Sequence, residues 1–127
     1  MKKRQLGRTG MEVSRLGFGG AEIGYEQASD RDVDAIVAAA IDAGVNVFDT
    51  AERYLDSEEK LGRALQGRRD QVFVFTKCGH ASGLDGEDWS PDMLSRSIDR
   101  SLQICEQTAS ICCSCTPVRR RCCAEGT

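Results

Sequence analysis

Two short segments, Val47-Phe48-Asp49-Thr50-Ala51-Glu52-Arg53-Tyr54 and Val72-Phe73-Val74-Phe75-Thr76-Lys77, carry the strongest structural signal in this chain. Each begins with β-branched and aromatic residues and runs into an ionisable side chain. Continuous apolar runs of this kind are typical of strands in a buried parallel sheet, whose carboxyl ends lie at one edge. We therefore expect Asp49, Tyr54 and Lys77 to meet at one site.

An amphipathic helix is expected before the first of these strands. Ser29, with Asp32 three residues later, resembles a capping box, and Gly44 supplies a stop. Apolar residues recur between them at helical spacing: Val33, Ile36, Val37, Ala40 and Ile41.

Two further helices follow the strands. Ser57 is expected to cap a shorter helix that ends near Gly67, and Ser90-Pro91 to start another. Their apolar faces are Leu61 and Leu65 in the shorter helix and Leu94, Ile98 and Leu102 in the last. Strands and helices thus alternate, which predicts a parallel sheet of about three βα units. A β-hairpin over residues 4–15, with its turn at Thr9-Gly10, is expected before the first unit.

Several motifs resemble the N-terminal part of an aldo-keto reductase, over residues 1–103. In chain order they are Arg4-Gln5-Leu6-Gly7-Arg8-Thr9-Gly10, Leu16-Gly17-Phe18-Gly19-Gly20, Asp49-Thr50-Ala51-x-x-Tyr54-x-x-Ser57-Glu58 and Thr76-Lys77. The resemblance implies an α/β fold, the N-terminal portion of a (β/α)8 TIM barrel, with the hairpin covering the barrel's bottom. The family usually has glycine directly after the tyrosine, where this chain has Leu55.

Chain length limits how much of that barrel is present. A (β/α)8 barrel needs about 250 residues, whereas this chain has 127. We therefore expect at most half of the barrel. The later strands and loops, which make most of the family's contacts with its cofactor, are expected to be missing.

Composition favours an ordinary globular protein. Hydrophobic residues make up 40% and charged residues 29%, with a net charge of -3. This balance predicts no nucleic-acid partner, and the run Arg119-Arg120-Arg121 lacks aromatic neighbours, so a solvated charge run is the better interpretation. No apolar run reaches membrane-spanning length, and residues 5–15 are too polar for a signal peptide, so we expect no membrane partner and a cytoplasmic location.

The last part of the chain differs sharply from the rest. Cys78 is the only cysteine before residue 105, and the others crowd the end: Cys105, Cys112, Cys113, Cys115, Cys122 and Cys123. The family would continue with a fourth strand that ends in Leu-His. Back-translating residues 104–116 and starting two bases later gives Leu-Arg-Thr-Asp-Cys-Ile-Asp-Leu-Leu-Gln-Leu-His. We infer a frameshift near Gln103, and expect residues 104–127 to be a disordered, cysteine-rich tail outside the family.

A metal site is the competing interpretation of this tail. Five thiols within residues 112–123 match zinc or cuprous ion by ligand count. The segment has no C-x-x-C pair and no nearby histidine, so no metal site is predicted. A non-catalytic, cysteine-rich metal-binding or interaction module remains the alternative function.

Strand spacing suggests the chemistry of the main site. Neighbouring strands lie about 4.8 Å apart, so Asp49 and Lys77 can form an ion pair. An ammonium group beside Tyr54 favours the phenolate and makes the phenol a usable general acid. The resemblance implies that NADPH delivers hydride to an aldehyde or ketone, Tyr54 protonates the alkoxide, Lys77 tunes Tyr54, and Asp49 holds Lys77. The carbonyl compound is a small molecule.

The cofactor and fourth catalytic positions are less well defined. Gly19 and Gly20 could let the backbone approach a nicotinamide ribose beside Asp49, although they could also be turn residues. The family's catalytic histidine ends the fourth strand and is absent here, because His80 is the only histidine and lies in the loop after Lys77. We expect His80 to be a surface residue, and the fragment to be inactive alone.

Overall fold

The computed structural model describes residues 1–80 and 83–105, together with the backbone of residues 111–115. The elements run in the order β1 (Lys3–Gln5), β2 (Glu12–Ser14), β3 (Phe18–Gly19), α1 (Ala21–Tyr25), α2 (Asp30–Asp42), β4 (Val47–Asp49), α3 (Ser57–Ala64), the 3-10 helix η1 (Arg69–Gln71), β5 (Phe73–Cys78), α4 (Pro91–Ile104) and β6 (Ile111–Cys115). Strands and helices alternate after the first hairpin, as the sequence predicts.

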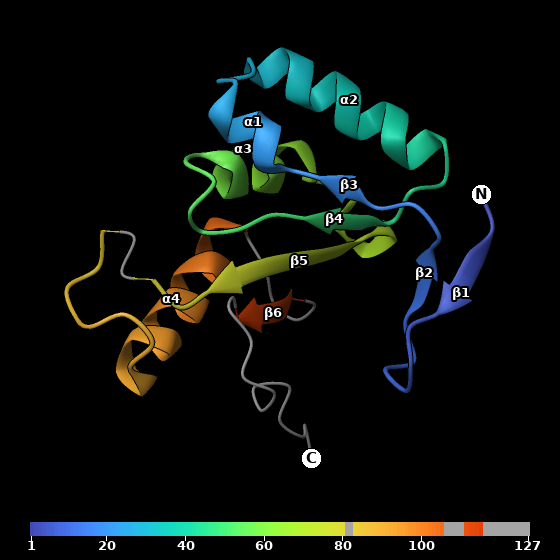
Figure 1. Ribbon diagram of the computed structural model, residues 1–127. Coiled ribbons are helices and arrows are strands. Elements are labelled where there is room, and N and C mark those ends of the chain that lie inside the picture. The colour runs from blue at the N-terminus through green and yellow to red at the C-terminus, as the bar shows by residue number, and fades with distance from the viewer. Residues whose placement is uncertain (81–82, 106–110, 116–127) are drawn as a thin grey trace.

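Four parallel strands form the sheet, in the order β3-β4-β5-β6. The helices follow one another along its outside, with α3 in contact with α1 and α2 and also with α4 (Figure 1). The described residues therefore make part of a barrel wall and no closed barrel. This confirms the expected α/β class and the incomplete barrel.

The core lies between the sheet and helices α1 to α3. Its buried members are Ile23, Val33, Val37, Val45, Phe48, Leu61, Leu65, Val72 and Val74. Burial alternates along β5, where Val74, Thr76 and Cys78 are buried but Phe73, Phe75 and Lys77 are only half-buried. The continuous apolar run predicted burial on both faces, whereas the described helices cover one face only.

Helix α2 begins and ends as the sequence predicts. The Ser29 hydroxyl accepts a hydrogen bond from the backbone N–H of Asp32 at 3.2 Å and donates to its carboxylate at 2.7 Å. Gly44, with a φ of +87°, takes the left-handed conformation that follows the helix end. Val33 and Val37 are buried, but Ile36 is exposed because it lies at the edge of the apolar stripe.

The expected cap of the next helix is wrong. Ser57 is the first residue of α3 rather than its cap, and Asp56 precedes the helix without a side-chain hydrogen bond. The buried Ser57 hydroxyl instead donates to the Gly20 carbonyl at 2.7 Å and bonds the Thr50 hydroxyl at 2.9 Å. Its hydrogen-bonding capacity is used to join α3 to the ends of β3 and β4.

Helix α4 starts at its expected cap but buries an unexpected face. Ser90 accepts a hydrogen bond from the Met93 N–H at 3.2 Å, with Pro91 at the first position. The buried residues are Met93, Ser97 and Ser101, while Leu94, Ile98 and Leu102 are half-buried. Small serine side chains let α4 come close to its neighbours, and Ser97 also donates a hydrogen bond to the buried Glu52 carboxylate.

The predicted hairpin is confirmed and lies at the end of the sheet where β4 and β5 begin (Figure 1). Its turn uses Gly7 and Gly10 at positive φ, and Leu6 N–H donates to the Met11 carbonyl at 2.8 Å. Asn46, buried just before β4, holds the hairpin in place. Its side chain accepts from Ser14 N–H at 2.7 Å and donates to the Glu12 carbonyl at 2.9 Å.

The final segment is described only in part. Cys105 is buried at the end of α4, and Ile111–Cys115 form β6, parallel to β5. A strand thus stands within the segment that we expected to be disordered. Residues 106–110 and 116–127 lie outside the described part, so disorder there stays a prediction. No described helix is long and apolar enough to cross a membrane.

Candidate active site

The ends of β4 and β5 bring two charged side chains together. Asp49 ends β4, and Lys77 lies in β5 two residues beyond Phe75, the β5 partner of Asp49. The Lys77 ammonium forms an ion pair with the Asp49 carboxylate and also donates to the Thr50 carbonyl at 2.8 Å. The Lys77 side chain is 25% exposed and that of Asp49 46% exposed, so the ion pair opens to solvent at the carboxyl edge of the sheet.

Tyr54 reaches the same site from the loop after β4. Its backbone N–H donates to the Ala51 carbonyl at 3.0 Å, which folds the loop back. The Lys77 nitrogen lies over the Tyr54 ring, 5.0 Å from its centroid. The structure therefore brings Asp49, Lys77 and Tyr54 together, with the lysine between carboxylate and phenol ring.

Helix α1, which the sequence analysis did not predict, packs against the Tyr54 ring and backbone. The Tyr25 ring meets the Tyr54 ring edge-on, with centroids 5.6 Å apart. Gly24 packs against the Tyr54 backbone so closely that a Cβ added there would lie 1.9 Å from the Tyr54 carbonyl oxygen. Only glycine allows α1 to approach this loop without displacing it.

Leu55 shows why glycine is usual after the tyrosine. Its φ of +51° is left-handed, a conformation that L side chains rarely adopt and glycine adopts freely. The Leu55 side chain is exposed, so little packing offsets this strain of roughly 1 kcal/mol.

A pocket of about 240 Å³ opens at these side chains. It is lined by Ala51, Glu52, Arg53, Tyr54, Lys77, Cys78 and His80. Sequence reasoning did not place His80 at the pocket; its side chain is partly exposed, at 32%, as a surface loop residue would be, but it also lines the pocket wall. Its position three residues beyond Lys77, at the carboxyl end of a parallel strand, is the signal that could have found it.

Glu52 was also missed, and it ties the two active-site loops to α4. Its side chain is 1% exposed, although it carries a carboxylate. It accepts hydrogen bonds from the His80 backbone N–H at 3.0 Å and from the Ser97 hydroxyl, and Arg100 lies 3.5 Å away. Because a buried charge must be paired, Glu52 fixes the loops after β4 and β5 relative to each other.

The two candidate cofactor glycines differ in their surroundings. A Cβ at Gly19 would meet nothing within 4 Å, so the backbone there is open to a ligand, and Gly19 lies beside Asp49 in the strand register. A Cβ at Gly20 would lie 2.9 Å from the Ser57 hydroxyl, and the Gly20 N–H and carbonyl are already bonded to Asp49 and Ser57. Packing alone accounts for glycine at position 20.

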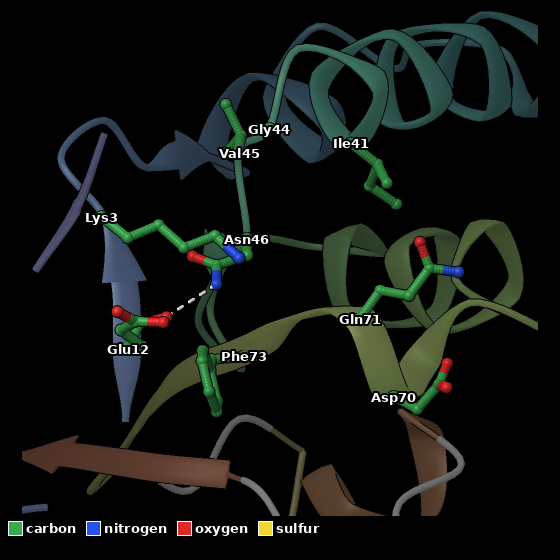
Figure 2. A pocket seen from close by; sticks show the side chains of 9 residues that line it. All are labelled: Lys3, Glu12, Ile41, Gly44, Val45, Asn46, Asp70, Gln71 and Phe73. Atoms are coloured by element: carbon green, nitrogen blue, oxygen red, sulfur yellow. Dashed lines mark hydrogen bonds between the residues drawn. The ribbon is translucent and has the colours of Figure 1, made fainter. Parts of the chain in front are cut away.

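A larger cavity, of about 470 Å³, lies at the opposite end of the sheet (Figure 2). Its walls come from the hairpin, the end of α2 and the starts of β4 and β5, with Lys3, Glu12, Asn46 and Phe73 among its lining residues. Size does not make it the better candidate. In βα barrels the amino ends of the strands serve stability, whereas catalytic groups stand at the carboxyl ends.

The tail thiols of the alternative metal site lie outside the described residues, since no side chain beyond Cys105 is described. Within residues 1–80 and 83–105, no group of three or more His, Cys, Asp or Glu side chains is placed to hold a metal ion.

Known proteins resemble this chain in sequence and in fold. Residues 15–110 match the model of the Aldo/keto reductase family. L-galactose dehydrogenase of Arabidopsis thaliana is 39% identical over 107 residues, which are 79% of this chain and 33% of that protein. The holo form of the Bacillus halodurans aldo-keto reductase AKR11C1 superposes with a TM-score of 0.77 at 30% identity, covering 91% of this chain and 40% of that one.

A third relative was solved with a nucleotide. The aldo/keto reductase of Klebsiella pneumoniae, in complex with NADP and acetate, superposes with a TM-score of 0.61 at 30% identity, over 77% of this chain and 33% of that one. The fold and the site thus define a piece of a (β/α)8 barrel with its polar side chains at the carboxyl edge. The chain belongs to the aldo/keto reductase family, and it spans about a third of the length of the curated relatives that it matches.

Proposed function

We propose that this chain carries the N-terminal part of an NADP(H)-dependent oxidoreductase that interconverts small aldehydes or ketones and their alcohols. One observation carries the proposal. Lys77 is held between the Asp49 carboxylate and the Tyr54 ring, at the mouth of a pocket on the carboxyl edge of a parallel sheet. Ion pair, phenol and pocket together suit proton transfer to a carbonyl oxygen.

Each side chain has a role in that reaction. Tyr54 donates its phenolic proton to the oxygen of the carbonyl compound and takes a proton back in the reverse direction. The positive charge of Lys77 stabilises the phenolate that is left behind. Asp49 holds the Lys77 ammonium near Tyr54 through their ion pair. NADPH, when bound beside this pocket, would supply the hydride for the carbonyl carbon.

The described residues fit part of a cofactor site. The open backbone at Gly19, next to Asp49, leaves room at the carboxyl edge for a ligand to approach. We assign Gly19, Gly20 and Asp49 to the contact with the cofactor. Gly19 leaves space for the cofactor, whereas Gly20 keeps the adjoining turn in place. The nucleotide in the Klebsiella pneumoniae relative supports NADP(H) as the cofactor class.

We propose further that these 127 residues are inactive alone. Their one histidine, His80, follows the third strand of the sheet, and the described sheet has four strands and no closure. A frameshift near Gln103 accounts for both the short match and the cysteine-rich end. Within residues 1–80 and 83–105 no contact favours the metal-binding or interaction module, which stays the alternative, and the cytoplasmic location stays a prediction.

Restoring the reading frame tests both parts of the proposal. The nucleotide sequence around codon 103 should give, in the shifted frame, a strand ending in Leu-His and a barrel of ordinary family size. That protein should oxidise NADPH in the presence of simple aldehydes, whereas the 127-residue chain should show no turnover and no measurable cofactor binding.

Within the restored protein, Tyr54→Phe should abolish turnover and leave NADPH affinity largely unchanged, because it removes the proton donor alone. Tyr25→Phe, in the neighbouring helix, is the matched control and should keep most of the rate. A Tyr54→Phe protein that retains its rate, or a shifted frame without a barrel, contradicts the proposal.

A further inference from the structure

Cys78 and Cys115 occupy matching positions at the ends of two neighbouring strands. Cys78 is the last residue of β5 and Cys115 the last residue of β6, and the parallel register pairs them directly. The two strands lie side by side in Figure 1, and β6 is the outermost described strand on that side of the sheet. Neither cysteine takes part in the proton transfer assigned to Tyr54.

The spacing of paired strands suits a disulfide bond. Neighbouring strands lie about 4.8 Å apart, and the Cα atoms of a disulfide are usually about 4.4–6.8 Å apart. Residues opposite each other in register belong to the same face of a sheet, because Cβ atoms alternate in step along both strands. Both positions also end their strands, where fewer ladder hydrogen bonds resist a small adjustment of the backbone.

The register singles out Cys115 among the cysteines of β6. Cys112 lies opposite Phe75. Cys113 lies opposite Thr76, so neither of these residues faces a cysteine of β5. A bond between the adjacent Cys112 and Cys113 is disfavoured as well, since successive residues of a strand belong to opposite faces.

Cys105, at the end of α4, is a poor competitor for the same bond. Its thiol is buried and donates to the Glu58 carbonyl at 3.9 Å. Burial, and then the Glu58 carboxylate, raise the pKa of Cys105 to about 12. Because the thiolate is the form that attacks a disulfide, this thiol reacts slowly at neutral pH.

A small oxidant has a route to Cys78. The residue is buried between the sheet and its surroundings, but it also lines the pocket of about 240 Å³ that contains Tyr54 and Lys77. The pocket opens at the carboxyl edge of the sheet, which is the edge where both β5 and β6 end. An oxidant of low molecular weight can therefore approach this position from solvent.

We propose that Cys78 and Cys115 form a reversible disulfide bond that ties β6 to β5 under oxidising conditions. The thiolate of one cysteine attacks oxidised glutathione, which gives a mixed disulfide and releases one glutathione thiol. The second cysteine, as its thiolate, then displaces the other glutathione. Overall, two protein thiols become one disulfide, and the electrons and protons that they lose convert oxidised glutathione into two thiols.

The bond has consequences for the edge strand and for the pocket. It encloses residues 79–114, which include α4, in a covalent loop, and such a loop restricts the unfolded chain. The attachment of β6 therefore becomes firmer on oxidation. In a reducing compartment thiols stay reduced, so the bond forms only when oxidant accumulates, and it changes the wall of the active-site pocket at Cys78.

Peptide mapping of the 127-residue chain tests the proposal. The chain is equilibrated with glutathione redox buffers, its remaining thiols are blocked with iodoacetamide, and it is digested with trypsin without reduction. Trypsin cleaves after Lys77 and Arg96, so Cys78 is the single cysteine of its peptide. That peptide should be joined to residues 101–119 of the same chain, and dithiothreitol should separate the two.

Single variants identify the partner within residues 101–119. Cys115→Ser should lower the linked fraction of Cys78 roughly tenfold or more, since the register pairs Cys78 with Cys115 alone. Cys113→Ser, two residues earlier on the same face of β6, is the matched control and should leave the linked fraction unchanged. In concentrated urea the sheet is lost, so the two variants should give equal linked fractions. This comparison separates a bond made by the fold from one made by an unfolded chain.

Four results would overturn the proposal. Cys78 could remain fully alkylated in the most oxidising buffer, or Cys115→Ser and Cys113→Ser could give equal linked fractions without urea. Cys78 could also be joined to the peptide that contains Cys122 and Cys123. Finally, the link could lie between two chains, which non-reducing electrophoresis detects. None of these measurements needs cofactor or turnover, so they do not depend on the reductase proposal.

Discussion

Gly24 sets how closely helix α1 approaches the loop that carries Tyr54. Glycine inside a helix normally costs about 1 kcal/mol relative to alanine, so an exposed Gly→Ala change would stabilise the helix. Here the added methyl group would collide with the Tyr54 carbonyl, 1.9 Å away, and backbone cannot rotate aside as a side chain can. Local propensity and tertiary packing therefore act in opposite directions at this position.

We expect Gly24→Ala to lower the free energy of unfolding by roughly 1–3 kcal/mol, the usual cost of overpacking. Urea unfolding of the frame-restored protein, followed by circular dichroism, measures this change. Gly19→Ala is the matched control, since its methyl group would meet nothing within 4 Å and should leave stability nearly unchanged. A stabilised Gly24→Ala chain would mean that α1 does not pack on the Tyr54 loop.

Cys105 is a buried thiol in an unfavourable place for a negative charge. Burial, and then the nearby Glu58 carboxylate, raise the pKa of Cys105 from 9.0 to about 12. Above pH 9 the unfolded chain loses this proton while the folded chain keeps it. The contribution of this thiol to stability is therefore intact below pH 9 and is lost as the pH rises from about 9 towards 12.

The free energy of unfolding should accordingly fall above pH 9, with a contribution from this thiol that approaches about 1.4 kcal/mol per pH unit. This pH dependence can be measured by urea unfolding of the parent chain and of Cys105→Ala. The pH values should run from roughly 8 to 10.5. The variant should be less stable at pH 8 but should lose stability less steeply. Parallel pH profiles for the two proteins would contradict the buried position of the thiol.

The β1–β2 hairpin depends on one side chain for its attachment to the sheet. The Asn46 side chain accepts from Ser14 N–H and donates to the Glu12 carbonyl, and the Asn46 backbone N–H donates to the Ser14 hydroxyl at 3.0 Å. Sequence patterns predicted the hairpin as a local unit, but an asparagine before a strand carries no local signal of such a contact. The partners are separated by more than thirty residues.

Asn46→Ala should release the hairpin and cost about 1–3 kcal/mol, since it leaves buried backbone groups without partners. Hydrogen exchange should speed up at Ser14, whose N–H loses its acceptor, while exchange in the middle of α2 changes less. Glu12→Gln is the control, because Glu12 contributes its backbone carbonyl and not its carboxylate. Unchanged protection at Ser14 in the Asn46→Ala chain would rule out this attachment.

The sheet as a whole has two edges within the described residues, at β3 and β6, each paired on one side only. Its inner face is also half-buried, as Phe73 and Phe75 show. Unpaired backbone groups and uncovered apolar side chains favour association with other chains or partial unfolding. A family barrel avoids both problems by closing the sheet on itself.

We therefore expect the 127-residue chain to be poorly soluble or partly unfolded. Sedimentation should detect concentration-dependent association, and thermal unfolding should be broad. The frame-restored protein is the matched comparison and should be a well-behaved species with a cooperative transition. A sharp, reversible melt of monomeric 127-residue chain would show that four strands suffice for a stable unit.

The sequence by itself determined the features that depend on neighbours along the chain. Apolar periodicity and the caps at Ser29 and Ser90 predicted the order of strands and helices, because these signals act within a few residues. Parallel strands place their carboxyl ends at one edge, so the meeting of Asp49 and Lys77 was also predictable. The barrel class came from the resemblance of the sequence motifs to the aldo/keto reductase family.

Only the tertiary structure decided the contacts between segments far apart in sequence. Ser57 looked like a helix cap and is instead buried against Gly20, and His80 looked like a surface residue and lines the pocket. Glu52 is buried because Ser97 and the His80 backbone satisfy its carboxylate, and neither partner is adjacent to it. A polar side chain can be buried only if other groups pair with it. Those partners are distant in sequence, so a local pattern does not predict them.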